Sequence, residues 1–267
     1  MKVNGKTIVV TGGAGGVGRQ LVLQLLAKGA TVAAVDISKE RLDDLAKAAA
    51  TDKLSVHVTD LSKLEAVETL YQEVMVKHGH VDGLINNAGI IQPFVKVKDL
   101  DYKKVNQVMN VNFFGTLYMC KTFLPELIKR PEGHILNVSS MGGFFPVPGQ
   151  AIYGASKAAV KLLTEGLYAE LMNTNVHVTL ALPGAMETDI AKNSNVDMGG
   201  SSDQKDQPKM KMLSAPDAAT IIINSMEKNR FIVYVGKDSK MLNFIYKLNP
   251  KSAPKIMYKA LKDRLEP

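Results

Sequence analysis

The side chains best suited to chemistry are Tyr153 and Lys157, which stand four residues apart in a predicted helix. Residues with this spacing share one helix face, with Cβ atoms roughly 5–6 Å apart. A cation so close favours the phenolate, so we expect Lys157 to lower the pKa of Tyr153 from about 10. Such a phenol can give or take a proton near neutral pH. Because Tyr-x-x-x-Lys also arises by chance on helices, the surrounding elements must decide.

The composition is that of an ordinary globular protein with a large core: of 267 residues, 46% are hydrophobic and 22% are charged. The single cysteine, Cys120, excludes an internal disulfide and favours a reducing compartment, so we expect the protein in the cytoplasm. The five histidines are scattered, and we expect no metal site. We expect neither a signal peptide nor a membrane span, since no apolar run approaches ~20 residues.

The net charge of +7 is concentrated at the C-terminal end. From residue 237 onward, eight lysine and arginine residues against three acidic residues leave +5. The basic excess therefore belongs to a tail and not to a nucleic-acid-binding surface, and we expect no nucleic-acid partner.

Seven short apolar runs are predicted to be strands, with helical patterns between them. The predicted strands are residues 7–10, 31–35, 54–58, 83–85, 135–138, 176–182 and 231–235. Apolar strands that alternate with helices form a parallel sheet covered on each side. We therefore expect a doubly wound α/β fold of about seven strands with helices on both faces, the Rossmann arrangement. Two helical stretches, 102–111 and 113–128, are interrupted by Asn110 and Asn112.

Nearly every conspicuous polar or glycine cluster follows the end of a predicted strand. These clusters are residues 12–18, Asp36, Asp60, 86–89, 139–140 and 183–184. Ligands of doubly wound sheets bind beyond the carboxyl ends of the strands. We therefore predict one ligand site built from these strand ends.

The turn after the first strand reads TGGAGGVG and leads into a helix. Glycines permit a sharp turn and the close approach of a pyrophosphate, and the helix N-terminus offers free N–H groups and positive partial charge. A turn that merely needs glycine is the alternative. The nucleotide site we predict here comprises Gly12, Gly13, Gly15, Gly16, Val17 and Gly18.

Asp36 closes the second strand, eighteen residues after Gly18. An acid at this place accepts hydrogen bonds from the adenosine ribose hydroxyls and repels a 2′-phosphate, so it favours NAD over NADP. A helix N-cap is the alternative role, although Ser38 is the better cap candidate. The basic residues Lys39 and Arg41 lie close to Asp36 in the sequence, so NADP remains an alternative cofactor.

Three further polar positions each have two interpretations. Asp60 is either a helix cap or a partner of the adenine amino group. The segment 86–89 is either a turn or part of the nucleotide site. Asn112 is unfavourable in a helix and lies among apolar residues, so its amide is either a structural bridge or a member of a polar relay.

Together, these motifs resemble those of the short-chain dehydrogenase/reductase superfamily, in its compact single-domain branch, over residues 6–235. The matching residues are Thr11, Gly12, Gly16, Gly18, the 86–89 Asn-Asn-Ala-Gly segment, Asn112, Ser140, Tyr153, Ser156, Lys157, Pro183, Gly184 and Thr188. The resemblance implies an oxidoreductase that moves a hydride between NAD(H) and a secondary alcohol or ketone. Two functions compete with it: an NADP-linked carbonyl or 3-oxoacyl reductase, and a nucleotide-sensing regulatory protein without chemistry.

The resemblance also implies roles for individual residues. Tyr153 would protonate the developing alkoxide, and Ser140 would hydrogen-bond the same oxygen. Lys157 would hold the nicotinamide ribose, and Asn112 would order a water that links Lys157 to solvent. Further cofactor contacts are expected from Asp60, Leu61, Asn87, Ala88, Gly89, Pro183, Gly184 and Thr188, besides Asp36, Tyr153, Lys157 and the glycine turn.

Three segments, residues 90–97, 141–150 and 186–213, are expected to enclose the substrate. The first two supply apolar walls, which predict an apolar or lipid-like substrate, although their phenylalanines suit a core or an interface equally well. Residues 193–211 are polar and are expected to form a lid or a disordered insertion. The expected substrate contacts are Ser140, Phe94, Phe145 and Met186.

We divide the chain into an NAD(P)-binding catalytic domain, residues 1–236, and a basic amphipathic extension, residues 237–267. Such an extension packs on its own domain, on another copy, or on an anionic membrane. We favour packing, with a homodimer or homotetramer as the assembly. Peripheral membrane contact through residues 241–265 is the alternative.

Overall fold

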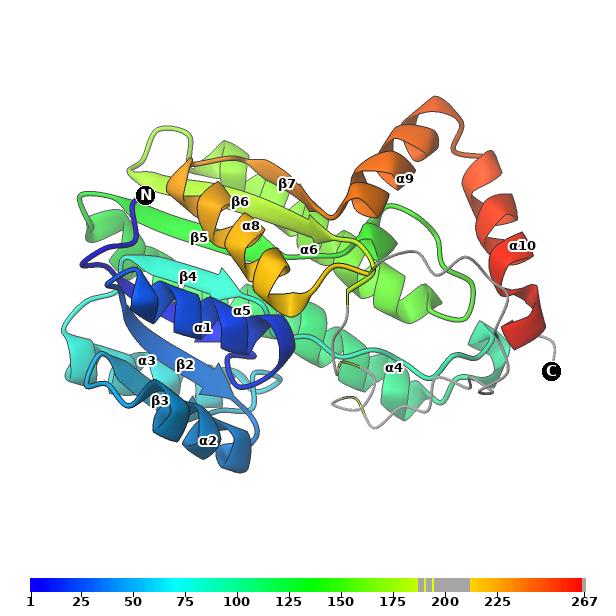
Figure 1. Ribbon diagram of the computed structural model, residues 1–267. Coiled ribbons are helices and arrows are strands. Elements are labelled where there is room, and N and C mark those ends of the chain that lie inside the picture. The colour runs from blue at the N-terminus through cyan, green and yellow to red at the C-terminus, as the bar shows by residue number, and fades with distance from the viewer. Residues whose placement is uncertain (187–189, 191–193, 195–211, 266–267) are drawn as a thin grey trace.

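One sheet of seven parallel strands organises the chain, in the order β3-β2-β1-β4-β5-β6-β7 (Figure 1). The computed structural model describes residues 1–186, 190, 194 and 212–265. The strands are β1 Thr7–Thr11, β2 Thr31–Asp36, β3 Leu54–Val58, β4 Gly83–Asn86, β5 Gly133–Val138, β6 Val176–Pro183 and β7 Ile232–Val235. The predicted doubly wound α/β fold is confirmed.

Helices cover both faces of the sheet (Figure 1). On one face lie α1 Gly16–Ala27, α2 Lys39–Ala49 and α8 Ala215–Glu227, and on the other lie α3 Leu64–His78, α5 Gly115–Lys129 and α6 Ala151–Glu170. Side chains alternate along β1: Ile8 and Val10 join the first core, and Val9 joins the second. A strand buried on both faces must therefore be apolar at successive positions, which explains the unbroken apolar run.

The two helical stretches expected around residues 102–128 form one continuous helix. It consists of α4 Tyr102–Met109, a π-helical turn at Asn110–Phe114 (η2), and α5. A π-helical turn adds a residue without ending the helix, and such turns are frequent at functional sites. The asparagines therefore widen the helix at this point and do not break it.

The order of the strands reverses between β1 and β4, which pair directly. Such a reversal opens a crevice at the carboxyl ends of the strands, where doubly wound sheets bind ligands. β5 pairs with β4 and β6 pairs with β5, so the ends of four neighbouring strands meet at this place.

The C-terminal extension forms α9 Lys237–Leu248 and α10 Ser252–Leu265, which project from the body of the molecule in Figure 1. The Tyr246 ring packs against Phe145, with a distance of 6.3 Å between the ring centroids. The exposed apolar side chains of the extension are Met241, Phe244, Leu248, Ile256 and Tyr258. Among the described residues, no helix is both long and apolar enough to cross a membrane.

Candidate active site

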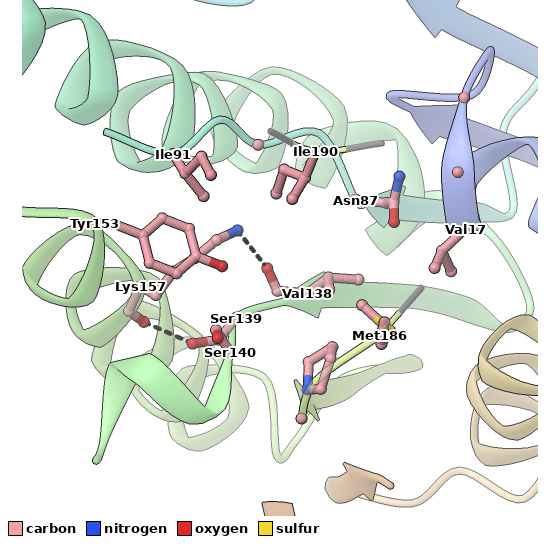
Figure 2. Close-up of a pocket in the computed structure, with 15 residues that line it drawn as sticks. Val17, Asn87, Ile91, Val138, Ser139, Ser140, Tyr153, Lys157, Met186 and Ile190 are labelled. Carbon is pink, nitrogen blue, oxygen red and sulfur yellow. Dashed lines mark hydrogen bonds between the residues drawn. The ribbon is translucent and has the colours of Figure 1, made fainter. Parts of the chain in front are cut away.

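A pocket of about 210 Å³ lies at the carboxyl ends of the central strands. Figure 2 shows Tyr153 and Lys157 towards one end of this pocket and Val17, Asn87 and Met186 towards the other. Its lining residues are Gly15, Gly16, Val17, Asn87, Gly89, Ile91, Val138, Ser139, Ser140, Tyr153, Lys157, Pro183, Gly184, Met186 and Ile190. The pocket thus unites residues that the sequence places in five separate segments.

Short hydrogen bonds fix the α6 residues against the end of β5. Lys157 Nζ donates to the Val138 carbonyl oxygen at 2.9 Å, and Ser139 Oγ donates to the Lys157 carbonyl oxygen at 2.7 Å (Figure 2). Ser140 follows directly in extended conformation, and its Oγ accepts from Gly142 N at 3.0 Å. Strand end and helix therefore hold Ser140, Tyr153 and Lys157 around one space.

The predicted electrostatics of the Tyr–Lys pair are wrong for the protein without cofactor. Burial raises the pKa of Tyr153, and a hydrogen bond with Ser140 opposes this rise only in part. Burial also lowers the pKa of Lys157 to about 8. Removal from water disfavours the charged form of both groups. Tyr153 is therefore a neutral phenol at pH 7, which is the form that donates a proton.

Asn112 lies in the π-helical turn and is fully buried. Its Oδ1 accepts from Ile90 N at 2.8 Å, and its Nδ2 donates to Ile90 O and to Ser156 Oγ, each at 2.9 Å. These bonds make it a structural bridge from α4–α5 to the loop after β4 and to α6. Its expected part in a water relay remains a prediction.

The glycine turn has the shape of an anion cradle. Gly12 and Gly16 have positive φ angles of 63° and 50°, and a Cβ on Gly12 would lie 2.9 Å from Ala88 Cα. A Cβ on Gly18 would collide with the carbonyl oxygen of Gly12. The first turn of α1 has no acidic residue, and Gly15, Gly16 and Val17 line the pocket. The free N–H groups in the first turn of α1 therefore suit a pyrophosphate.

The Asn-Asn-Ala-Gly segment supports this cradle from β4. Asn87 Nδ2 donates to Thr11 O at 3.1 Å, while the backbone N–H groups of Asn87 and Ala88 both donate to Thr11 Oγ1. A Cβ on Gly89 would lie 3.1 Å from Lys157 Nζ and 3.4 Å from Asn112 Oδ1. The segment is therefore a packed junction in which Gly89 leaves room beside Lys157.

Asp36 ends β2 beside the glycine turn and is largely buried. Its Oδ2 accepts from Ala14 N at 3.2 Å, and its Oδ1 accepts from Ser38 N at 3.1 Å and from Arg41 Nη2 at 3.2 Å. Ser38 caps α2, as expected. The carboxylate is therefore fixed beside the glycine turn, with the Arg41 guanidinium alongside, and its contact with a ribose remains a prediction.

Asp60 and Leu61 follow β3 but do not line the pocket. Asp60 Oδ1 accepts from Ser62 N and Ser62 Oγ, whereas the cap of α3 is Lys63, so the helix-cap interpretation of Asp60 is wrong. Leu61 is buried and packs beside Gly115. Adenine contact by either residue remains a prediction.

The expected substrate contacts divide into two groups. Ser140 and Met186 line the pocket, but Phe94 and Phe145 do not. Phe145 follows η3 Met141–Gly143 and is only 1% exposed, and its ring packs against Tyr246 of the extension. Phe94 packs over Gly149 instead. None of residues 141–150 lines this pocket, so the wall predicted from that segment is absent from it. Thr188 and most of the 193–211 segment lie outside the described residues.

Four pocket residues are absent from the contacts expected individually: Ile91, Val138, Ser139 and Ile190. Val138 and Ser139 adjoin the predicted strand end, and Ile91 and Ile190 fall inside two of the expected substrate segments. Pocket residues next to a strand end can thus be found from the sequence. Which side chain of a loop points into the pocket depends on how the loop folds, and the sequence alone does not show this.

Known proteins share both sequence and fold with this chain. The family model for short chain dehydrogenases matches residues 6–199. The 3-oxoacyl-[acyl-carrier-protein] reductase FabG of Thermotoga maritima is 38% identical over 192 residues, which cover 70% of this chain and 77% of that protein. An uncharacterized oxidoreductase of Staphylococcus saprophyticus is 32% identical over 244 residues, covering 89% of this chain and 98% of that protein.

Two solved structures extend the likeness. A short chain dehydrogenase/reductase from Burkholderia phymatum in complex with NAD has a TM-score of 0.81 at 25% identity, covering 91% of this chain and 93% of that one. A short chain dehydrogenase from Burkholderia cenocepacia in complex with NADP has a TM-score of 0.80 at 27% identity, covering 96% and 99%. The chain therefore belongs to the short-chain dehydrogenase/reductase family and is an oxidoreductase that transfers a hydride between a nicotinamide cofactor and an alcohol or carbonyl group.

Proposed function

We propose that the protein is an NAD-dependent dehydrogenase/reductase of an apolar secondary alcohol or ketone, with Ser140, Tyr153 and Lys157 as its catalytic residues. The observation that carries this proposal is the convergence of these three side chains with the Gly15–Val17 part of the anion cradle on one pocket. The nicotinamide cofactor, when bound, supplies the hydride for carbonyl reduction and accepts it in alcohol oxidation.

In reduction, the phenol of Tyr153 donates its proton to the carbonyl oxygen as the carbonyl carbon receives the hydride, and an alcohol forms. Ser140 Oγ hydrogen-bonds the same oxygen and orients it. Lys157, held by Val138 O, favours the phenolate left on Tyr153. Asn112 holds Ile90 and Ser156 around Lys157, and a water at the widened turn would return the proton. Oxidation uses the same groups in reverse.

For the cofactor, we propose NAD. The Asp36 carboxylate suits ribose hydroxyls as an acceptor and would repel a 2′-phosphate. Asp60, Leu61, Pro183, Gly184 and Thr188 are the further contacts we assign to the cofactor. The alternative is an NADP-linked 3-oxoacyl reductase. Arg41 lies beside Asp36, where it would meet a 2′-phosphate, and one relative is named a 3-oxoacyl-[acyl-carrier-protein] reductase.

For the substrate, apolar side chains on the pocket wall support an apolar alcohol or ketone: Val17, Ile91, Met186 and Ile190. The test is NADH oxidation with a series of methyl ketones of increasing alkyl length. We expect kcat/KM to rise with chain length, since each buried methylene is worth about 0.8 kcal/mol. A flat series contradicts the apolar pocket, and a strong preference for NADPH contradicts the proposed cofactor.

For the assembly, we propose a cytoplasmic homodimer or homotetramer in which the apolar row Met241, Phe244 and Leu248 of α9 meets another copy. These side chains are 50%, 63% and 69% exposed. Sedimentation of the full chain and of Phe244→Lys tests this. Loss of association in the variant supports the contact, whereas unchanged sedimentation together with wild-type flotation on anionic liposomes favours the membrane alternative.

A further inference from the structure

Gln92 lies in the loop after β4 and is completely buried. Its Oε1 accepts two hydrogen bonds from the start of α6, from Ile152 N at 2.8 Å and from Tyr153 N at 3.0 Å. Its Nε2 donates to Gly149 O at 3.0 Å. In return, Gln150 Nε2 donates to the Gln92 carbonyl oxygen at 2.9 Å. Four hydrogen bonds thus tie one loop residue to the beginning of the helix that carries Tyr153.

The first N–H groups of a helix lack partners within the helix, and a cap side chain ordinarily serves the second and third of them. In α6 these groups belong to Ile152 and Tyr153, and the local cap residue, Gln150, makes no side-chain cap hydrogen bond. Gln92 supplies the acceptor from 60 and 61 residues away in the sequence. The cap of α6 is therefore a tertiary contact.

This contact affects Tyr153 differently from Lys157. Lys157 has anchors of its own at the end of β5, through Val138 O and through Ser139 Oγ just beyond the strand. The backbone of Tyr153 in the first turn is held from outside the helix by Gln92 Oε1. If this acceptor is lost, the N–H groups of Ile152 and Tyr153 lose their partner, while the anchors of Lys157 and the bond from Ser156 Oγ to Tyr153 O stay in place.

The loop of Gln92 also forms part of the pocket. Ile91 lines it, and Ile91 N donates to Ser194 Oγ at 3.0 Å. Ile90 is clamped on both sides by the side chain of Asn112. The consecutive residues Ile90, Ile91 and Gln92 thus contact the widened helix, the segment after β6 and the start of α6, respectively.

We propose that Gln92 is a positioning residue for the reaction: by capping α6 from the loop after β4, it holds the Tyr153 phenol against Ser140 for proton transfer. This inference rests on the proposed function, in which Tyr153 is the proton donor. It predicts that loss of the cap lowers kcat and leaves cofactor affinity nearly unchanged.

The test compares Gln92→Met with Gln150→Met. Each replaces the amide of a buried glutamine that joins the same two segments with an apolar group of similar size, but only Gln92→Met removes the acceptor of the Tyr153 N–H. Hydrogen exchange at the Ile152 and Tyr153 amides, thermal unfolding, NADH affinity by fluorescence, and kcat with saturating ketone are measured for each. Gln92→Glu keeps the acceptor oxygen and serves as the rescue.

We expect Gln92→Met to lose amide protection and to reduce kcat at least tenfold, with a change in NADH Kd of less than threefold. Gln150→Met is expected to lower Tm about as much as Gln92→Met does, but to keep kcat within threefold of wild type. Gln92→Glu is expected to recover amide protection and most of kcat. If Gln92→Met does not fold, the comparison is made with Gln92→Glu.

Loss of amide protection in Gln92→Met with unchanged kcat overturns the positioning role and leaves the proposed function standing. An equal loss of kcat in Gln150→Met, or a folded Gln92→Glu with protected amides and kcat reduced tenfold, also overturns it. A wild-type protein that binds NADH but reduces no carbonyl compound overturns both proposals together.

Discussion

Lys157 Nζ donates a hydrogen bond of 2.9 Å to the carbonyl oxygen of Val138, at the end of the neighbouring strand β5. The side chain is only 3% exposed, and burial lowers the pKa of Lys157 to about 8. A pKa of about 8 in place of 10.5 corresponds to a cost of roughly 3 kcal/mol for the charged form of Lys157 at neutral pH. The fold thus keeps a cation beside Tyr153 at the expense of its own stability.

Replacing this cation with an apolar side chain should therefore stabilise the protein without cofactor. We expect Lys157→Met to be more stable at pH 7 by about 1–2 kcal/mol, since the loss of the hydrogen bond to Val138 O offsets about 1 kcal/mol. Urea unfolding measures this difference, and the same variant should have lost its activity.

The sign of the pH dependence follows from the lowered pKa of Lys157. Lys157 loses its proton near pH 8 in the native state, whereas the unfolded chain keeps it up to about pH 10.5. The destabilisation caused by the buried charge is therefore complete below pH 8 and decreases above it. The stability difference between Lys157→Met and wild type should therefore shrink from pH 7 to pH 10. A variant less stable than wild type at pH 7, or a constant difference, would contradict this account.

Gly89 and Gly166 offer a matched pair of Gly→Ala substitutions. A Cβ on Gly89 would press on Lys157 Nζ at 3.1 Å, so we expect Gly89→Ala to weaken NADH binding and turnover about tenfold. Gly166 lies within α6 with nothing within 4 Å of its Cβ position. Gly166→Ala should therefore raise stability by about 0.5–1 kcal/mol and leave activity unchanged. Equal kinetics for both variants would show that space beside Lys157 is not needed.

Asp36 should set the choice between NAD and NADP. In Asp36→Ser the repulsion of a 2′-phosphate is gone, and Arg41, whose Nη2 lies 3.2 Å from Asp36 Oδ1, is placed to meet such a phosphate. We expect the ratio of kcat/KM for NADPH over NADH to rise about 100-fold, roughly 2.7 kcal/mol. The double variant Asp36→Ser, Arg41→Ala is the control and should lose most of this gain. An unchanged ratio in Asp36→Ser would remove Asp36 from cofactor selection.

Local sequence patterns predicted most of the fold and the centre of the site. Strands such as TIVVT are apolar at successive positions because both faces of the sheet are covered, and the Tyr153–Lys157 spacing follows directly from the helix period. Ser139 and Ser140 were singled out because they follow the end of a strand, and the family resemblance selected Ser140 of the two. These features depend on neighbours in the chain, and neighbours can be read from a sequence.

The features that were missed depend on contacts between distant segments. A glutamine in a loop has the composition of a surface residue, and only the fold brings Gln92 to the start of α6. Asn112 is tolerated inside a helix because the Ile90 backbone satisfies its amide. The pKa of Tyr153 is raised because burial outweighs the hydrogen bond with Ser140, and burial depends on the tertiary fold. Phe145 faces Tyr246 because the extension after β7 returns to this loop.

The most direct test of the central claim is a stopped-flow comparison of wild type with Tyr153→Phe, with NADH and a ketone substrate. The variant lacks only the phenolic oxygen. We predict NADH binding within threefold of wild type and a rate of hydride transfer that falls at least 10³-fold, within the range attributed to a positioned general acid. Hydride transfer at an undiminished rate in Tyr153→Phe would contradict the role of Tyr153 as the proton donor.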